Sequence, residues 1–143
     1  MTEKLPIQIS KACEYLIAKA YPAYDAKTCG HCAEKVRQAW DFALGKGMTH
    51  TLHAKDYGPI YQGLGFRKIF SFPLMDKKSY IPQIGDLCII QYEPDGHICV
   101  KTAQGWISDF KQGTGGSKLP LADMYGGHIR DKNPPFDIYR FHA

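Results

Sequence analysis

Residues 87–110 have the sequence LCIIQYEPDGHICVKTAQGWISDF, and this stretch decides the fold class. Residues 87–92 form a near-continuous apolar run, which is typical of a buried strand. Pro94-Asp95-Gly96 then predicts a turn. Residues 97–101 and 106–110 follow as two more strand-like segments, separated by a second turn that contains glycine. The stretch therefore predicts an antiparallel meander of three strands.

Two helices are predicted before this meander. Apolar residues recur at helical spacing over residues 7–20, and this helix must stop before Pro22. A second helix is predicted to begin at Cys32 and to end near Gly45 or Gly47. The residues expected on its buried face are Val36, Ala39, Trp40 and Ala43.

The remaining segments complete the predicted domain. Residues 53–61 suggest a short helix or ordered loop, residues 66–72 an imperfectly alternating strand, and residues 136–141 a closing strand. Helices followed by a run of strands predict an α+β fold in which the N-terminal helices pack on one face of an antiparallel sheet. The 143 residues fit one domain, residues 1–143.

Composition excludes several kinds of partner. Eighteen Lys and Arg against fourteen Asp and Glu give a formal charge of +4, which favours an anionic partner. The positive residues are scattered without a basic run, so we expect no nucleic-acid partner. No apolar run is long enough to span a membrane, and the N-terminus lacks an apolar signal-peptide core. We therefore expect a protein made in the cytoplasm without a signal peptide and with no membrane partner.

Three residues suggest a cysteine hydrolase. A cysteine at a helix N-terminus, as predicted for Cys32, lies at the positive end of the helix dipole, which lowers the pKa of a thiol and favours the nucleophilic thiolate. His97 begins a predicted strand and can act as its base, and Asp109 on the following strand can fix the imidazole tautomer. Taken singly, each has a structural alternative: a packed helix-start cysteine, a structural histidine and a solvent-facing carboxylate.

The cysteines also fit other chemistries. Cys29-Gly30-His31-Cys32 is also a redox dithiol sequence, but residues 20–28 do not form the hydrophobic strand that precedes a thioredoxin-like motif. This CxxC pair lacks a second cysteine pair or a suitably spaced histidine pair, so no metal site is predicted. Cys29 and Cys99 are competing nucleophiles. Cys99 lies mid-strand among apolar residues, and Cys29 precedes the first helical turn.

At these residues the chain resembles the papain-like cell-wall amidases and peptidases of the NlpC and CHAP type. The resemblance covers roughly residues 28–141 and includes Pro82-x-x-Gly85-Asp86, Gly96-His97-Ile98 and residues 106–110. It implies a papain-like NlpC/CHAP-type core, with a catalytic cysteine at a helix start and a histidine and a polar third residue on successive strands. Cys29 departs from the commoner pattern, and a disulfide between Cys29 and Cys32 would silence the enzyme under oxidising conditions.

The small size, missing signal peptide and basic charge are similar to the amidase effectors of bacterial type VI secretion. This resemblance implies an antibacterial toxin that is secreted and hydrolyses peptidoglycan stem-peptide or cross-link amide bonds in the periplasm of a target bacterium. It implies no cofactor, peptidoglycan as substrate and a cognate immunity protein as partner. A phage lysin or housekeeping wall hydrolase, a CxxC thiol-disulfide oxidoreductase and a noncatalytic wall-binding protein remain alternatives.

The predicted mechanism is acyl transfer, in which Cys32 attacks a peptide carbonyl, His97 protonates the leaving amine and Asp109 orients His97. Lys55, Tyr57 and Tyr61 are candidates for the wall of a substrate groove. The two tyrosines are four residues apart, so they equally fit one packed helical face.

Overall fold

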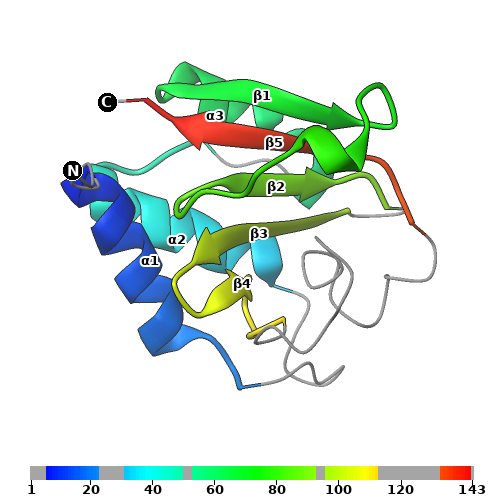
Figure 1. The fold of residues 1–143 in the computed structure, drawn as a ribbon. Coiled ribbons are helices and arrows are strands. Elements are labelled where there is room, and N and C mark those ends of the chain that lie inside the picture. The colour runs from blue at the N-terminus through cyan, green and yellow to red at the C-terminus, as the bar shows by residue number, and fades with distance from the viewer. Residues whose placement is uncertain (1–5, 23–30, 50–52, 93–95, 113–132, 143) are drawn as a thin grey trace, which may run out of the picture.

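A computed structural model describes residues 6–22, 31–49, 53–92, 96–112 and 133–142 of the chain. The helices and strands, in chain order, are α1 (Ile7–Lys19), α2 (Cys32–Leu44), η1 (Ala54–Asp56), α3 (Gly58–Gly63), β1 (Phe66–Phe72), η2 (Lys77–Ser79), β2 (Leu87–Ile90), β3 (His97–Thr102), β4 (Gly105–Ile107) and β5 (Phe136–Phe141), where η denotes a 3-10 helix. Figure 1 shows them arranged as one sheet with the helices beside it.

The five strands form an antiparallel sheet in the order β1-β5-β2-β3-β4. The predicted meander is confirmed as β2-β3-β4, although β4 ends at Ile107 instead of continuing to Phe110. The C-terminal strand β5 lies between β1 and β2 (Figure 1). The sequence predicted a closing strand but not this central position, because strand periodicity does not reveal which strands pair.

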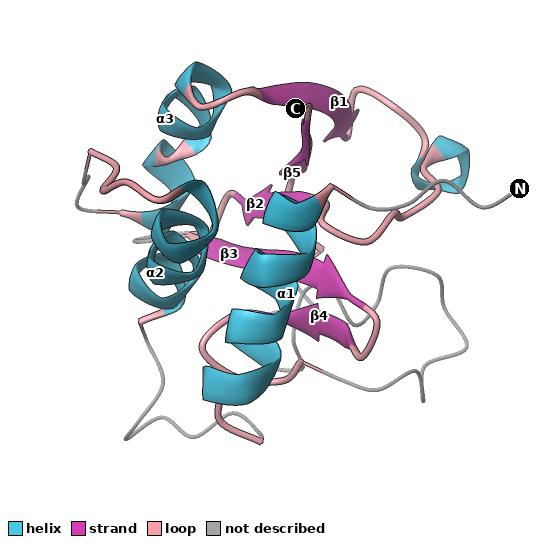
Figure 2. Cartoon of the chain, turned by 90° about the vertical axis from the view of Figure 1, so that its left-hand side faces the viewer, coloured by secondary structure: helices cyan, strands magenta, loops and turns pink. Residues whose placement is uncertain are grey.

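The helices α1 and α2 pack side by side on one face of this sheet (Figure 2). The buried face of α2 is the one predicted, and both helices pack over Ile98 and Val100 of β3. α2 ends at Gly45, whose φ of 73° is the left-handed conformation that glycine adopts readily. The α+β architecture predicted from the sequence is therefore confirmed. The buried residues of α1 are Ile9, Ala12, Cys13 and Leu16, and those of α2 are Cys32, Val36, Ala39, Trp40 and Ala43.

A second apolar cluster covers the opposite face of the sheet. Strand β2 contributes to both sides, because Leu87 and Ile89 belong to the helix-side core and Cys88 and Ile90 to the other cluster. All four residues are buried, which explains their continuous apolar run. The other members of the second cluster are Phe70, Tyr80, Cys99, Trp106, Phe136 and Ile138.

The turn before β2 is tied to the C-terminal strand by a buried charge. Asp86 is inaccessible to solvent, and its two carboxylate oxygens accept hydrogen bonds from Arg140 Nε at 2.7 Å and Nη2 at 2.9 Å. The Tyr80 hydroxyl donates a third bond to Asp86, at 2.7 Å. A bidentate arginine–carboxylate pair of this kind compensates the desolvation of a buried carboxylate. No helix in the described part of the chain is long and apolar enough to cross a membrane.

Candidate active site

Cys32 is the first residue of α2, as predicted, and only 9% of it is exposed. Its thiol lies against the backbone of Ile98, the residue that follows His97 in β3. Val36 of α2 and Val100 of β3 both belong to the buried core on the helix side of the sheet. The fold therefore brings the start of α2 to the start of β3, although the two residues are far apart in the sequence (Figure 1).

The acidity of Cys32 differs from the prediction. Burial raises the pKa of the thiol to about 12. Hydrogen bonding from the backbone of Ile98 opposes this effect, and the carboxylate of Asp109 adds to it. Cys32 does lie at a helix start, but the cost of desolvating the thiolate outweighs the stabilisation that the helix dipole gives it. Cys32 is therefore a protonated thiol at neutral pH, and its use as a nucleophile requires a base.

His97 is the first residue of β3 and is 5% exposed. Its Nε2 lies 2.5 Å from Oε1 of Gln112, and its ring centroid is 6.1 Å from that of Phe110. Sequence reasoning did not identify Gln112. A single glutamine two residues beyond the predicted strand gives no pattern from which its contact with His97 could be predicted.

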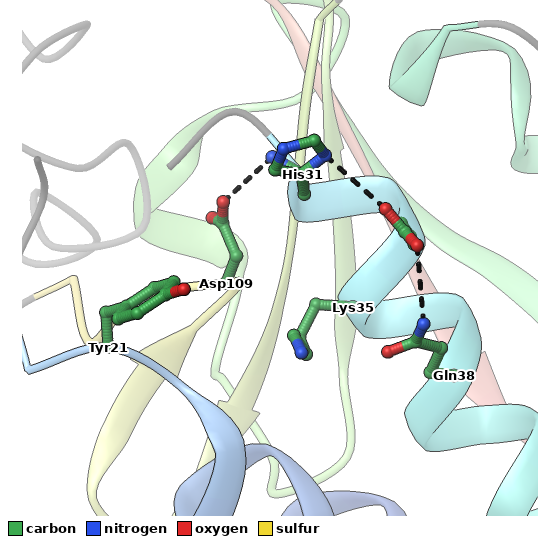
Figure 3. A pocket seen from close by; sticks show the side chains of 6 residues that line it. Tyr21, His31, Lys35, Gln38 and Asp109 are labelled. Atoms are coloured by element: carbon green, nitrogen blue, oxygen red, sulfur yellow. Dashed lines mark hydrogen bonds and ion pairs between the residues drawn. The ribbon is translucent and has the colours of Figure 1, made fainter. Parts of the chain in front are cut away.

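Asp109 lies just beyond β4 and is 1% exposed, so the solvent-facing alternative for this residue is wrong. Its Oδ2 accepts a hydrogen bond from the backbone N–H of His31 at 2.9 Å, and its Oδ1 accepts one from Ser108 Oγ at 3.1 Å. His31 immediately precedes Cys32 (Figure 3). The Asp109 carboxylate therefore lies at the N-terminal end of α2, where it satisfies a backbone donor and contributes to the electrostatic environment of Cys32.

A surface pocket of about 170 Å³ opens beside this helix start (Figure 3). It combines both signs of charge, because Glu34 and Asp109 are acidic and Lys35 is basic. His31 Nδ1 lies 3.4 Å from a Glu34 oxygen. Asp109 is shared between the pocket and the surroundings of Cys32. The pocket therefore borders the helix start at which Cys32 is the first residue. Its lining residues are Tyr21, His31, Glu34, Lys35, Gln38 and Asp109.

The three predicted groove residues have different locations. Tyr57 and Tyr61 are buried in the helix-side core, with ring centroids 6.1 Å apart, so the groove-wall prediction for them is corrected. Tyr61 packs edge-on against Phe66, which accounts for its burial. Tyr57 and Tyr61 instead pack together in the core, which was the alternative interpretation of their spacing. Lys55 is half-buried and its backbone lies against the Gly96 turn that precedes His97.

The described residues contain three further thiols. Cys13, Cys88 and Cys99 are buried free cysteines, like Cys32. Cys29 lies outside the described residues, as does residue 30 of the predicted dithiol motif. Among the residues that the structure describes, no group of three or more His, Cys, Asp or Glu side chains is arranged to hold a metal ion.

The fold and site define an α+β protein in which a buried cysteine at a helix start adjoins a strand that begins with a buried histidine. No model of a protein family and no curated protein sequence matches the chain. Two solved structures do, both of the type VI effector-immunity complex Tae3-Tai3 from Ralstonia pickettii. The native form is 31% identical with a TM-score of 0.69, covering 94% of this chain and 98% of that chain.

The selenomethionine form of the same complex is 30% identical with a TM-score of 0.66, and the match covers 90% of this chain and 98% of that chain. Identity at this level over nearly the full length of both chains shows common membership of a family. The chain therefore belongs to the family of the type VI effector Tae3.

Proposed function

We propose that this protein is an antibacterial type VI secretion effector that cleaves peptidoglycan as a cysteine amidase or endopeptidase. Tae denotes an amidase effector, and membership of the Tae3 family supports this class of activity. The observation that carries the cysteine mechanism is the position of Cys32, whose buried thiol lies at a helix start against the strand that His97 begins. The same features support a papain-like core.

In the proposed reaction, His97 removes the proton of the Cys32 thiol as the sulfur attacks a peptide carbonyl carbon. The imidazolium then protonates the leaving amine, and water hydrolyses the resulting thioester. The raised pKa of Cys32 makes His97 necessary, because little thiolate is present without a base. The backbone N–H of Cys32, at the start of α2, is a candidate donor to the oxyanion. Neither a metal nor a cofactor enters these steps.

Asp109 is the third polar member of the proposed triad. Its carboxylate is buried at the start of α2, where it interacts electrostatically with Cys32. A negative charge there disfavours an isolated thiolate but favours the imidazolium that His97 becomes during the reaction. This supports a role in stabilising the charged form of His97.

The proposed substrate is inferred from the net charge of the chain, and the proposed partner from its family membership. Peptidoglycan stems carry free carboxylates, and the formal charge of +4 favours their capture. Lys55, beside the turn before His97, remains a candidate contact with the stem peptide. Tae3 was crystallised with Tai3 in an effector-immunity complex, and we propose that this chain likewise has a cognate immunity protein in the producing cell and acts in the periplasm of a target bacterium.

The test is release of soluble muropeptides from purified peptidoglycan under reducing conditions, with the products identified by mass spectrometry. Wild type should release fragments whose masses identify the bond, whereas Cys32→Ala and His97→Ala should release none. Cys13→Ala is the matched control, because it removes a buried thiol from α1, and Cys29→Ala tests the competing cysteine; both should cleave. Cleavage by Cys32→Ala at the wild-type rate would refute the mechanism and favour a redox or binding protein.

A further inference from the structure

We infer that Cys88 and Cys99 are a disulfide site: under oxidising conditions they form a bond that links the central strand β2 to β3 and stabilises the folded chain. The chemistry of this pair goes beyond the proposed peptidoglycan activity and does not depend on it. Its physiological setting does rest on the proposed function, which moves the chain from the reducing cytoplasm of a producing cell to the oxidising periplasm of a target cell.

The two cysteines lie directly opposite each other on neighbouring strands. Cys88 of β2 is the register partner of Cys99 of β3, and Figure 1 shows these two strands side by side. Both residues are fully buried, and a hydrogen bond joins their thiols. The fold therefore brings the two sulfur atoms into contact.

The backbone spacing at this position suits a disulfide. Backbone groups of successive residues in a strand point to opposite neighbours. The N–H of Gln91 donates to the carbonyl of Pro135 on the β5 side of β2, so the backbone groups of Cys88 face β3. Cys88 and Cys99 are thus a hydrogen-bonded antiparallel pair, whose Cα atoms are about 5.5 Å apart, a separation that disulfides commonly span.

The surroundings of the pair are apolar. Cys88 and Cys99 belong to the cluster on the face of the sheet opposite the helices, together with side chains such as Trp106 and Phe136. A thiol donates and accepts hydrogen bonds only weakly, so replacing two thiols by one S–S bond leaves no strongly polar group without a partner. A disulfide can therefore take the place of the thiols in this cluster.

The sheet separates this pair from the proposed nucleophile. Cys32 and Cys13 belong to the core on the helix side, whereas Cys88 and Cys99 belong to the opposite cluster. Oxidation within the pair leaves Cys32 as a thiol. It also fixes β3 to β2 close to the start of β3, where His97 lies.

The reaction is an exchange with an external disulfide, such as glutathione disulfide or the disulfide of a periplasmic oxidoreductase. One cysteine thiolate attacks this oxidant and releases one oxidant thiol, and the second cysteine then displaces the other. Two cysteine thiols are oxidised to one S–S bond, and one external disulfide is reduced to two thiols, which take up the two protons. Burial raises the pKa of Cys88 well above its usual value, so the exchange takes place while the chain is open.

Refolding of the reduced and denatured chain tests the pairing. One sample is refolded with reduced glutathione alone and another with a mixture of reduced and oxidised glutathione, and the remaining thiols are blocked with iodoacetamide. Trypsin leaves both cysteines in residues 79–101, and a protease that cleaves before aspartate then separates them at Asp95. Mass spectrometry of the oxidised sample should find the two fragments joined until a reductant is added.

The melting temperature gives a second readout. A cross-link across this short loop constrains the unfolded chain, and oxidation should therefore raise the melting temperature by about 5–10 °C. The rise should persist in the control variants Cys13→Ala and Cys29→Ala. It should be absent in Cys88→Ala and in Cys99→Ala, which each lose one half of the pair. Each variant is compared with its own reduced form, so any effect of the substitution on stability cancels.

The outcomes separate the inference from the proposed function. Unlinked fragments in the oxidised sample would overturn the inference, as would a disulfide that instead joins Cys29 to Cys32. A linked pair that leaves the melting temperature unchanged or lower would overturn it too. If the linked pair forms and stabilises the chain but the reduced chain releases no muropeptides, the disulfide site stands and the proposed activity fails. Muropeptide release without a linked pair would have the opposite meaning.

Discussion

At the scale of single residues, the main result is that a buried thiol and a buried carboxylate share the start of one helix. Burial raises the pKa of Cys32 to about 12, and the nearby charge of Asp109 acts in the same direction. In a hydrolase this arrangement keeps the resting thiol protonated and makes its reactivity depend on His97.

Asp109→Asn tests the two effects of this charge. The variant keeps an oxygen for the N–H of His31 but removes the carboxylate. We expect kcat/KM for muropeptide release to fall tenfold or more, since the imidazolium loses its stabilising charge. The pKa of Cys32 should fall at the same time, because Asp109 raises it in the wild type.

The measurement is the pH dependence of Cys32 alkylation in two variants, His97→Ala and His97→Ala combined with Asp109→Asn. Both lack the base His97, so only the effect of the Asp109 charge differs between them. The midpoint should move to lower pH when the carboxylate is removed. An unchanged midpoint together with unchanged cleavage would limit Asp109 to its contact at the helix start.

The buried tyrosines offer a second test. Tyr61 is fully buried and its hydroxyl has no hydrogen-bond partner in the described part of the chain, whereas the hydroxyl of Tyr80 donates to buried Asp86. Tyr61→Phe should raise the free energy of unfolding by about 1 kcal/mol and leave cleavage unchanged. Tyr80→Phe should lower it by about 1–3 kcal/mol. Urea titration of the pair measures both. A loss of cleavage in folded Tyr61→Phe would contradict this structural role and support the groove-wall prediction for Tyr61.

The positions of two candidate residues could be predicted at this scale. Cys32 was located from helix periodicity, and His97 from its place after a glycine turn. The contact of Gln112 with His97 depends on how the chain leaves β4, and the raised pKa of Cys32 depends on how closely α2 packs on β3. Both are properties of tertiary packing, which sequence spacing does not contain.

At the scale of elements, the backbone at Gly96 precedes β3 and its first residue, His97. Gly96 has a φ of 79°, and a Cβ there would lie 2.6 Å from Cβ of Lys55 and 2.8 Å from the carbonyl oxygen of Ile90. Two of the close atoms belong to the backbone of Ile90 and Lys55. An added Cβ could therefore avoid the clash only if the backbone at Ile90 or at η1 moved.

Gly96→Ala should therefore displace His97 as well as strain the turn. We expect it to lower the free energy of unfolding by more than the roughly 1 kcal/mol of a left-handed alanine, and to reduce cleavage. Gly45→Ala is the matched control, because Gly45 has a φ of 73° but nothing within 4 Å of an added Cβ. Chemical denaturation and muropeptide release should separate the two variants. If Gly96→Ala and Gly45→Ala had equal stability and equal activity, contact with η1 would not restrain the backbone at Gly96.

The elements themselves were largely predictable. The buried faces of α1 and α2 follow from residues such as Leu16, Val36 and Trp40 at helical spacing. The imperfect alternation of β1 has a structural cause, a register shift between Lys68 and Phe70. The position of β5 could not be predicted, because its residues fit equally well beside any antiparallel neighbour.

At the scale of the whole molecule, several groups titrate at higher pH in the folded chain than in an unfolded one. Burial raises the pKa of Cys13 to about 11 and those of Cys32 and Tyr139 to about 12. Above about pH 9, the usual pKa of a thiol, the unfolded chain therefore binds fewer protons than the folded chain. The free energy of unfolding must then decrease as the pH rises.

We expect the melting temperature to fall progressively from about pH 9 upward as these groups ionise in the unfolded chain. Differential scanning calorimetry from pH 7 to pH 11 measures this dependence. Cys13→Ala should have a shallower slope than wild type, because it removes one of the contributing groups. A melting temperature that is constant or rises between pH 9 and pH 11 would contradict the burial of these groups.

The family relationship extends over the whole molecule, since the match to the effector-immunity structures covers nearly all of both chains. Within this family we propose that Cys32 forms a covalent thioester with a peptidoglycan peptide. The most direct measurement is to react the protein with peptidoglycan, quench with acid and locate any adduct by mass spectrometry of the proteolysed protein. We expect a stem-peptide acyl group on Cys32, and no such adduct in Cys32→Ala. An acyl group on Cys29 instead, or efficient cleavage by Cys32→Ala, would contradict it.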